Sequence, residues 1–379
     1  MIDPVALARQ LVRSRSIAPT DDGALTTAQE ALASIGFTCH PLLFEDPTSP
    51  PIHNLYARWG KGTRSFAFAG HTDVVPAGDE SLWSVDPFAG EVRDGVLIAR
   101  GAADMKGCVA AFIAAASRLV STLDPSRATI GVILTGDEET LAINGTAKCM
   151  TWLQDRDEIP DVCLVGEPTS TDALGDTLKI GRRGTLSARL TVHGQQGHVA
   201  YPAKHDNPVN RLVRLFAQVL ASPLDEGSDD FEPSHLEVTS IDVGNTATNI
   251  VPSRAVASFN IRFNDRHTVA SLLEQIHHHA EKVGARIKIE TISQSDSFLC
   301  SCDTFVQHLV RSIEKSTGLS PQKSTGGGTS DARFIKNYCP VAEFGLPGGS
   351  IHQIDEHART QDIIRLAEAY ETIVLDFFT

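Results

Sequence analysis

Histidine and acidic side chains follow several short apolar segments of this sequence, and these residue types commonly bind divalent metal ions. His71 and Asp73 come directly after the apolar segment at 64–70. Because they are two residues apart, they can leave an extended chain on the same side. A neutral imidazole is a common zinc ligand, and a nearby carboxylate can orient the ring and raise its basicity. An H-x-D pair alone is equally compatible with a solvated turn, so further ligands are required.

Two adjacent carboxylates, Glu138 and Glu139, follow a second apolar segment at 129–135. They would repel each other, and an exposed turn is the simplest explanation. The functional alternative is that one binds a cation while the other remains free as a general base. Glu167 closes a third apolar segment, where an unpaired carboxylate would be costly to bury.

Asp104 and His352 complete the set of candidate residues. Asp104 stands at the start of a predicted helix, where an N-cap is the alternative role. His352 follows a Gly-Gly pair that allows close approach of the backbone. Together, two histidines and three carboxylates predict a mixed nitrogen and oxygen site for two divalent metals, with one carboxylate shared. By contrast, the consecutive His277, His278 and His279 point about 100° apart on a predicted helix, and we interpret them as solvated surface.

The segments that carry these residues predict a largely parallel sheet. Those at 64–70, 129–135 and 161–166 are apolar throughout, and a segment with helical spacing lies at 106–120. Strands that are apolar on both faces and alternate with helices are typical of a parallel sheet covered on both sides. Ligands of such sheets bind at the carboxyl ends of the strands, which is where the candidate residues stand.

A different pattern begins near residue 180. Strands are predicted at 185–194, 235–244, 254–263 and 286–292, and helices at 207–220 and 268–283. This β-α-β-β-α-β order is the ferredoxin-like arrangement. We therefore expect an α/β protein with two domains. A discontinuous catalytic domain, 1–180 and 295–379, has a mostly parallel sheet with helices on both faces, and 181–294 is an inserted ferredoxin-like α+β domain.

Composition excludes several classes of protein. The 379 residues contain 33 Lys and Arg against 47 Asp and Glu, a formal net charge of −14, which disfavours binding to nucleic acid or to anionic membranes. No apolar run approaches the roughly 20 residues of a membrane span. The first residues lack the basic and apolar regions of a signal peptide. Seven scattered cysteines predict reduced thiols in a cytoplasmic protein.

A set of motifs runs through almost the whole chain: HTDVVPAGD (71–79), WSVDPF (83–88), ARGAADMKG (99–107), LTGDEE (134–139), AINGTAK (142–148), LVGEPT (164–169), IGRRGTLS (180–187), GQQGHVAYP (194–202), ATNIVP (247–252), GGGTSDARF (326–334) and SIHQIDE (350–356). Together these motifs resemble one known family, the bacterial succinyl-diaminopimelate desuccinylases of the dizinc aminoacylase and carboxypeptidase superfamily. The resemblance implies a cytoplasmic homodimer, formed through the inserted domain, that hydrolyses N-succinyl-LL-2,6-diaminopimelate to succinate and LL-2,6-diaminopimelate in lysine and diaminopimelate biosynthesis.

The resemblance also implies which residues hold the metals. Asp104 would bridge two Zn²⁺ ions, for which Co²⁺ can substitute. His71 and Glu167 would complete one site. Glu139 and His352 would complete the other.

Catalytic and substrate-binding roles follow from the same resemblance. Glu138 would be the general base and Asp73 would orient His71, while His198 would reach the active site of the partner subunit and donate a hydrogen bond to the oxyanion. The implied substrate contacts are Arg182, Asn249, Arg262, Thr329, Ser330, Arg333 and the position of Gly348. Arginines suit a substrate with several carboxylates because their planar forks bind carboxylates with two hydrogen bonds. The neighbouring Arg183 is equally compatible with a surface ion pair.

Two positions depart from the family pattern. Gly348 stands where the family usually has Asn, so that one side-chain amide contact is missing or is supplied by the backbone. Ala332 stands where Gly is usual, which requires an ordinary φ at that position.

Two alternatives remain from the sequence. The first is acetylornithine deacetylase or another N-acyl amino acid deacylase of the same superfamily, against which HTDVVPAGD, RGAADMKG and GRRG favour the desuccinylase. The second is an inactive metal-binding dimeric scaffold. An intact Glu138 beside intact ligands argues against a scaffold, which has no need of a free base.

Overall fold

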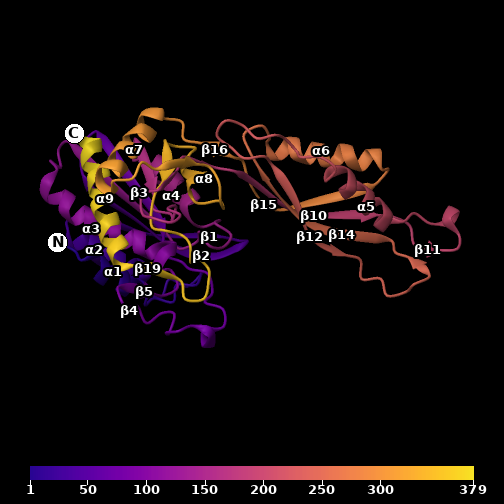
Figure 1. Ribbon diagram of the computed structural model, residues 1–379, viewed down its shortest axis with the longest axis horizontal. Helices are drawn as coiled ribbons and strands as arrows, with labels where there is room; N and C mark the ends of the chain where they lie inside the picture. The colour runs from indigo at the N-terminus through magenta and orange to yellow at the C-terminus, as the bar shows by residue number, and fades with distance from the viewer. The chain divides into compact units, whose positions relative to one another are not determined.

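A computed structural model describes all 379 residues and divides into two compact units (Figure 1). Unit 1 comprises Met1–Gly181, Cys300–Ser324 and Ser330–Thr379, and it contains both chain termini. Unit 2 comprises Arg182–Leu299 and Thr325–Thr329. The glycine-rich segment 325–329, which the sequence analysis assigned to the catalytic part, groups with unit 2 because Thr325 Oγ1 donates to Asp230 O at 2.6 Å and Arg182 Nη1 to Gly328 O at 3.0 Å.

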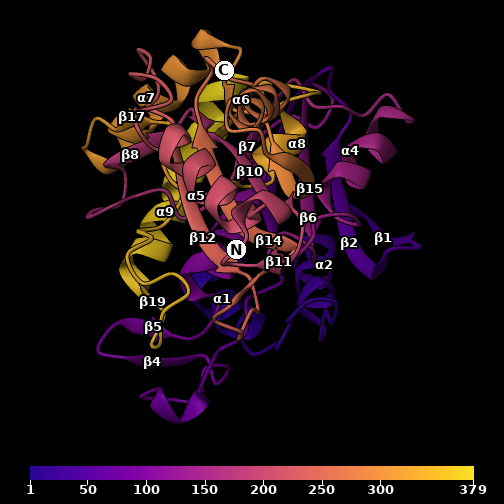
Figure 2. The same ribbon diagram turned by 90° about the vertical axis from the view of Figure 1, so that its right-hand side faces the viewer.

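Unit 1 is built on an eight-stranded mixed sheet in the order β1-β2-β6-β3-β7-β18-β8-β17 (Figure 2). Its central strands β6, β3, β7 and β18 are parallel, whereas β1, β2 and β6 pair antiparallel. β6 and β7 are buried along their whole length because both faces of the sheet are covered. The strands are β1 Thr38–Asp46, β2 Ser49–Gly60, β3 Arg64–His71, β6 Ala128–Thr135, β7 Val162–Val165, β8 Thr177–Lys179, β17 Gln322–Ser324 and β18 Val341–Glu343.

Helices cover both faces of this sheet (Figure 1). One face carries α1 Pro4–Leu11, α2 Ala24–Ser34, α3 Gly107–Thr122, α7 Asp303–Thr317 and α9 Thr360–Phe378, and the other carries α4 Thr146–Gln154 and α8 Ala332–Ile335. Contrary to the expectation that no apolar run approaches the length of a membrane span, the helical stretch Ala102–Thr122 is long and apolar enough to cross a membrane by length and composition alone. Its apolar window is 78% buried inside the protein, between α1, α9 and the sheet, as expected of a core helix.

A small three-stranded sheet, β19-β5-β4, lies at the lower edge of unit 1 in Figure 2. Its strands are β4 Glu91–Arg93, β5 Val96–Ile98 and β19 His357–Arg359, with the 3₁₀ turn η1 Glu80–Leu82 nearby in the chain. The turn η2, Ala102–Lys106, follows β5 and leads into α3. This sheet anchors the chain on the C-terminal side of His352, because β19 pairs with β5.

Unit 2 has the four-stranded sheet β12-β14-β10-β15, with α5 and α6 on one face (Figure 1). Its elements are β10 Gly184–His193, β11 Gly197–His198, η3 Pro202–Lys204, α5 Pro208–Val219, β12 His235–Asp242, β13 Ile250–Val251, β14 Arg254–Phe263, α6 Val269–Lys282 and β15 Arg286–Ser295. Side chains of β14 alternate strictly between buried and half-buried or exposed, so one face of the sheet packs on the helices. Asn207 and Thr268 cap α5 and α6 through their side chains.

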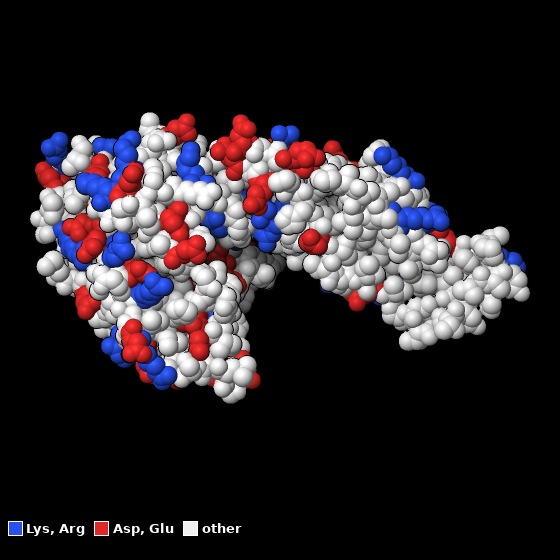
Figure 3. Space-filling view, in the orientation of Figure 1, with Lys and Arg blue, Asp and Glu red and all other residues white.

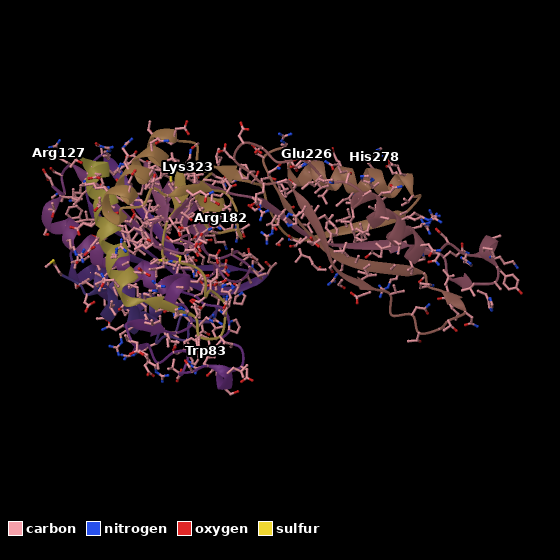
Figure 4. The ribbon with its side chains drawn as sticks, in the orientation of Figure 1. Trp83, Arg127, Arg182, Glu226, His278 and Lys323 are labelled. Atoms are coloured by element: carbon pink, nitrogen blue, oxygen red, sulfur yellow. The ribbon has the colours of Figure 1, made fainter.

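The predicted fold class is confirmed, including the β-α-β-β-α-β order of the insert. The short strands β9 Gly181–Arg182 and β16 Phe298–Leu299 lie where the chain passes between the units. The consecutive histidines of α6 are surface residues, since His277 and His278 are exposed and His278 points outward in Figure 4.

Candidate metal centre

The strand ends of unit 1 bring the candidate ligands to one edge of the sheet. β3 ends at His71, β6 ends just before Glu138 and Glu139, and β7 ends just before Glu167. Because these three strands are parallel neighbours, their carboxyl ends meet. Asp104 reaches the same edge from η2.

His71, Asp104 and Glu167 form a first cluster. His71 Nε2 lies 3.1 Å from Asp104 Oδ1 and 3.9 Å from Glu167 Oε1. All three side chains are nearly inaccessible to solvent. Their nearest ligand atoms lie within 4.8 Å of one another, which is close enough to surround one ion.

Asp104, Glu139 and His352 form a second cluster, which shares Asp104 with the first. His352 Nε2 lies 2.9 Å from Glu139 Oε1 and 3.3 Å from Asp104 Oδ2. The two carboxylate oxygens of Asp104 therefore face different histidines. Asp104 does not cap α3, since the helix begins at Gly107. His352 has φ 61°, an uncommon value for a residue with a side chain, so its position depends on its surroundings.

Asp73 links the His71 segment to the two adjacent glutamates. The backbone carbonyl of Asp73 lies 2.9 Å from His71 Nδ1. A carbonyl can only accept, so Nδ1 carries the proton and a neutral ring directs the lone pair of Nε2 toward the cluster. The Asp73 carboxylate lies 3.7 Å from Nδ1 and accepts the backbone N–H groups of Glu138 at 3.2 Å and Glu139 at 2.9 Å. Asp73 thus contacts the ring through its backbone and the glutamates through its side chain.

The electrostatics of the site favour bound cations. Burial, and then the charge of Glu167, raises the pKa of Glu138 well above its usual range. Hydrogen bonds to Asp104 and Glu139 raise the pKa of His352 to about 10. Burial alone would raise the pKa of Asp104, but hydrogen bonds from His352 and His71 lower it below its usual range. Carboxylates and imidazoles are the oxygen and nitrogen donors that zinc takes, so the residues fit two divalent ions that share Asp104.

Three of the predicted substrate-binding positions lie in unit 1. Ser330 is fully buried, and its hydroxyl donates to Glu343 Oε1 at 2.6 Å, so this side chain faces the interior. Arg333 is half-buried, with Cζ 4.7 Å from the ring centroid of Phe334. The backbone N–H of Gly348 donates to Ser170 O at 2.9 Å.

The other predicted substrate-binding residues, Arg182, Asn249, Arg262 and Thr329, belong to unit 2. Arg182, labelled in Figure 4, is 9% exposed. Burial and the neighbouring Arg183 lower the pKa of Arg262. Arg183 makes an ion pair with Glu232, at 3.3 Å.

His198 is exposed in unit 2, on the short strand β11. Its Nδ1 lies 3.1 Å from the backbone nitrogen of Ala200, which donates. The neutral ring therefore carries its proton on Nε2, and Nε2 is a hydrogen-bond donor.

Sequence reasoning missed a buried ion pair beside the ligands, between Arg100 and Glu356. Both residues belong to quoted motifs, ARGAADMKG and SIHQIDE, but nothing in the sequence indicates that they meet across 256 positions. It also missed Lys106, whose fully buried Nζ donates to Ser14 O at 2.8 Å.

Comparison with known proteins identifies relatives of the whole chain. Residues 67–376 match the family model "Peptidase family M20/M25/M40". The chain is 50% identical to a succinyl-diaminopimelate desuccinylase of Rhodospirillum centenum, covering 99% of this chain and 97% of the relative. It is 47% identical to one of Bradyrhizobium diazoefficiens, covering all of both chains.

Solved structures share the fold at lower identity. An aminopeptidase of Bacillus cereus superposes with a TM-score of 0.79 at 20% identity, over 100% of this chain and 98% of that one. A Bacillus subtilis protein described as a dinuclear metal binding peptidase from the M20 family superposes with a TM-score of 0.72 at 13% identity, over 98% and 97%. The paired acidic and histidine clusters at the sheet edge stand on a fold that these relatives share. By the family match and the full-length identity, the chain belongs to peptidase family M20/M25/M40.

Proposed function

We propose that this protein hydrolyses the amide bond of N-succinyl-LL-2,6-diaminopimelate, giving succinate and LL-2,6-diaminopimelate for lysine and diaminopimelate biosynthesis. Relatives named succinyl-diaminopimelate desuccinylase match the chain from end to end at 46–50% identity. The observation that carries the proposal is the pair of three-residue clusters that share Asp104, with Glu138 beside them.

Two Zn²⁺ ions, with Co²⁺ as a substitute, are the proposed cofactors. His71, Asp104 and Glu167 would hold one, and Asp104, Glu139 and His352 the other. When bound, such ions polarise the scissile carbonyl and lower the pKa of the attacking water.

Glu138 has the surroundings of a general base. Its carboxylate lies within reach of His71 and Glu139, the residue is half-buried, and its pKa is raised, so it can hold a proton between two steps. In the reaction, Glu138 takes a proton as the water oxygen bonds to the acyl carbon. It then gives that proton to the amine nitrogen as the C–N bond breaks. Asp73 keeps the base in place through the backbone N–H groups of Glu138 and Glu139.

The family resemblance implies that arginine and polar side chains recognise the substrate. Arg182, Arg262 and Arg333 would bind the carboxylates of the substrate with their planar forks. Asn249 and Thr329 would add hydrogen bonds. Ser330 would act through Glu343, since its hydroxyl donates to that carboxylate. At Gly348 the N–H is already bonded to Ser170 O, and the carbonyl accepts from Ile351 N at 3.2 Å, so only the second lone pair of that oxygen is left for the substrate.

The proposed oligomer is a homodimer formed through unit 2, in which His198 donates its Nε2–H to the oxyanion in the active site of the second copy. The protonation of Nε2 and the exposure of His198 support this role. The exposed Val199 and Tyr201 next to it suit a surface that packs against another protein. On the face shown in Figure 3, this end of unit 2 has almost no charged side chains. The seven free cysteines support a cytoplasmic location.

One experiment separates the proposed function from its alternatives. The Zn²⁺-loaded protein is assayed for amide hydrolysis of N-succinyl-LL-2,6-diaminopimelate and of N-acetylornithine, before and after chelation. We expect turnover of the succinyl substrate that chelation abolishes and Zn²⁺ restores. Faster turnover of N-acetylornithine would favour a deacetylase, and tight zinc binding without hydrolysis of either would favour a scaffold.

A further inference from the structure

Arg100 and Glu356 form a buried ion pair that the roles proposed above do not use. Arg100 Nη1 donates to Glu356 Oε2 at 2.6 Å, and the residues are 2% and 0% exposed. Removing two charges from water is costly, and a buried pair is weak support for stability by itself. We therefore consider which neighbouring residues the Arg100–Glu356 pair contacts and positions.

The second oxygen of Glu356 holds the backbone of Asp104. Glu356 Oε1 accepts the N–H groups of Ala103 and Asp104, both at 3.1 Å. Asp104 departs from helical geometry, with φ −118° and ψ 97°, so its N–H group depends on an acceptor outside the turn. Because both clusters share Asp104, Glu356 fixes the backbone that carries the shared ligand.

Glu356 also belongs to the segment that carries His352. The two ends of this segment, Ser350 and His357, are hydrogen-bonded to each other: Ser350 Oγ donates to His357 O at 3.0 Å and accepts from His357 N at 3.1 Å. The backbone carbonyl of Glu356 accepts from Ala99 N at 2.9 Å. One residue thus ties the His352 segment to the Asp104 segment.

Arg100 also contacts the segment that carries His352 and fixes the orientation of the Glu356 carboxylate. Its Nη2 lies 3.4 Å from Pro76 O and 3.5 Å from His352 O, and its guanidinium carbon lies 5.3 Å from the ring centroid of Trp83, labelled in Figure 4. The guanidinium is therefore held by the Trp83 ring and by contacts at both Nη atoms, and it holds the Glu356 carboxylate in one orientation.

We propose that Glu356, held by Arg100, is a positioning residue that sets the place of Asp104 relative to His352 and so the metal affinity of the cluster they form with Glu139. This role rests on the proposed metal-dependent function, because it acts on residues proposed as ligands. A purely structural ion pair would affect folding stability alone.

The test is stepwise Zn²⁺ binding by calorimetry to metal-free protein, in parallel with unfolding by denaturant. In Glu356→Gln one oxygen can still accept from the two amides, but the new NH₂ group faces the donors of Arg100. We expect Zn²⁺ affinity at the Asp104–Glu139–His352 cluster to fall about 10–100-fold, the range typical for residues that orient ligands. The His71–Asp104–Glu167 cluster should change less, because strands β3 and β7 position His71 and Glu167 independently.

Leu309→Ala is the matched control for lost stability. Leu309 is fully buried in the core of unit 1, on α7, which packs against α9. This variant should unfold more readily yet bind both ions within about twofold of the unchanged protein, because distant sites act independently.

The outcomes are distinct. Unchanged Zn²⁺ affinity in Glu356→Gln, with a stability loss like that of Leu309→Ala, would overturn the positioning role. If Glu356→Gln does not fold, Arg100→Lys decides: it keeps the charge but loses the fork, so we expect weaker binding at the His352 cluster, and unchanged affinity overturns the proposal. An unchanged protein that binds no Zn²⁺ would instead contradict the proposed metal-dependent function.

Discussion

Glu138 and Glu139 are neighbours in the chain, yet their carboxylates have different surroundings. Glu139 Oε1 lies 2.9 Å from His352 Nε2, in the cluster that shares Asp104. Glu138 groups only with His71 and Glu139, and its pKa is raised by burial and by Glu167. These surroundings support the proposed roles, Glu139 as a ligand and Glu138 as the general base, which the family resemblance implies and the residue pattern alone left open.

We expect Glu138→Gln to keep both metals and to lose turnover about 10²–10⁴-fold, because it removes the base and leaves the ligands in place. The matched variant Glu139→Gln should lose metal from the cluster that contains His352. Metal analysis of the dialysed proteins, alongside kcat, checks both. Zinc loss in Glu138→Gln in proportion to its activity would assign that residue to metal binding instead.

Gly348 has too little room for the side chain that the resembled family usually carries. A Cβ atom at this position would lie 2.7 Å from Pro168 O, a backbone atom next to Glu167. We therefore expect Gly348→Asn to lower the free energy of unfolding by about 1–3 kcal/mol, as overpacking does, and to lower kcat/KM.

The neighbouring Gly349→Asn is the matched control. A Cβ atom there meets nothing within 4 Å, so the unfolding free energy should change by less than about 0.5 kcal/mol. Denaturant unfolding and steady-state kinetics check the pair. A large gain in kcat/KM for Gly348→Asn would show that the loop moves and that an amide contact is missing.

At the scale of elements, the sequence predicted the parts whose signals are local. Continuous apolar runs located β3, β6 and β7, and the helices predicted at 207–220 and 268–283 correspond to α5 and α6, which Asn207 and Thr268 cap. The β1–β2 hairpin was missed because β1 is an edge strand with one buried residue, so it lacks a strong apolar pattern. Of the candidate site, the ligand types and strand ends were predictable. The pairing of Arg100 with Glu356 was not, because it depends on how β19 meets β5.

Strand β15 is the element that we expect to form the dimer. It is an edge of the unit 2 sheet, paired only with β10, and residues 290–294 are all exposed. An exposed edge strand is a template for pairing with a second copy. Ile292 is 65% exposed at its centre. We expect Ile292→Lys to weaken the dimer roughly tenfold or more, the effect of about 1.4 kcal/mol.

Ile241→Lys, on the opposite edge strand β12, is the control, since Ile241 is 53% exposed. Sedimentation over a range of concentrations measures both dissociation constants. A monomer in Ile241→Lys and an intact dimer in Ile292→Lys would place the interface on β12.

At the scale of the whole molecule, unit 1 holds the candidate ligands and the base, while His198 lies on unit 2. In the proposed dimer, His198 of each copy would donate a hydrogen bond in the active site of the other copy. In the single chain, the N–H of Ala200 donates to Nδ1 of His198, so the neutral ring carries its proton on Nε2 and can donate it. The exposed ring also lies 5.6 Å from that of Tyr201, so its support is local to this end of unit 2.

We expect His198→Ala to fold, to bind zinc and to form the dimer, yet to lose about 10²–10³ in kcat, the usual contribution of one oxyanion donor. Mixing it with inactive Glu138→Gln under subunit exchange should restore activity. In a mixed dimer, one active site combines the intact Glu138 of the first chain with the intact His198 of the second. With random exchange of equal amounts, about a quarter of all sites would be of this kind. Mass spectrometry follows the formation of mixed dimers. Recovery of activity toward a quarter of that of the unchanged protein, at the same rate as the mixed dimers form, would support donation between subunits. Heterodimers without any recovery would show that His198 acts within its own chain or has no part in the reaction.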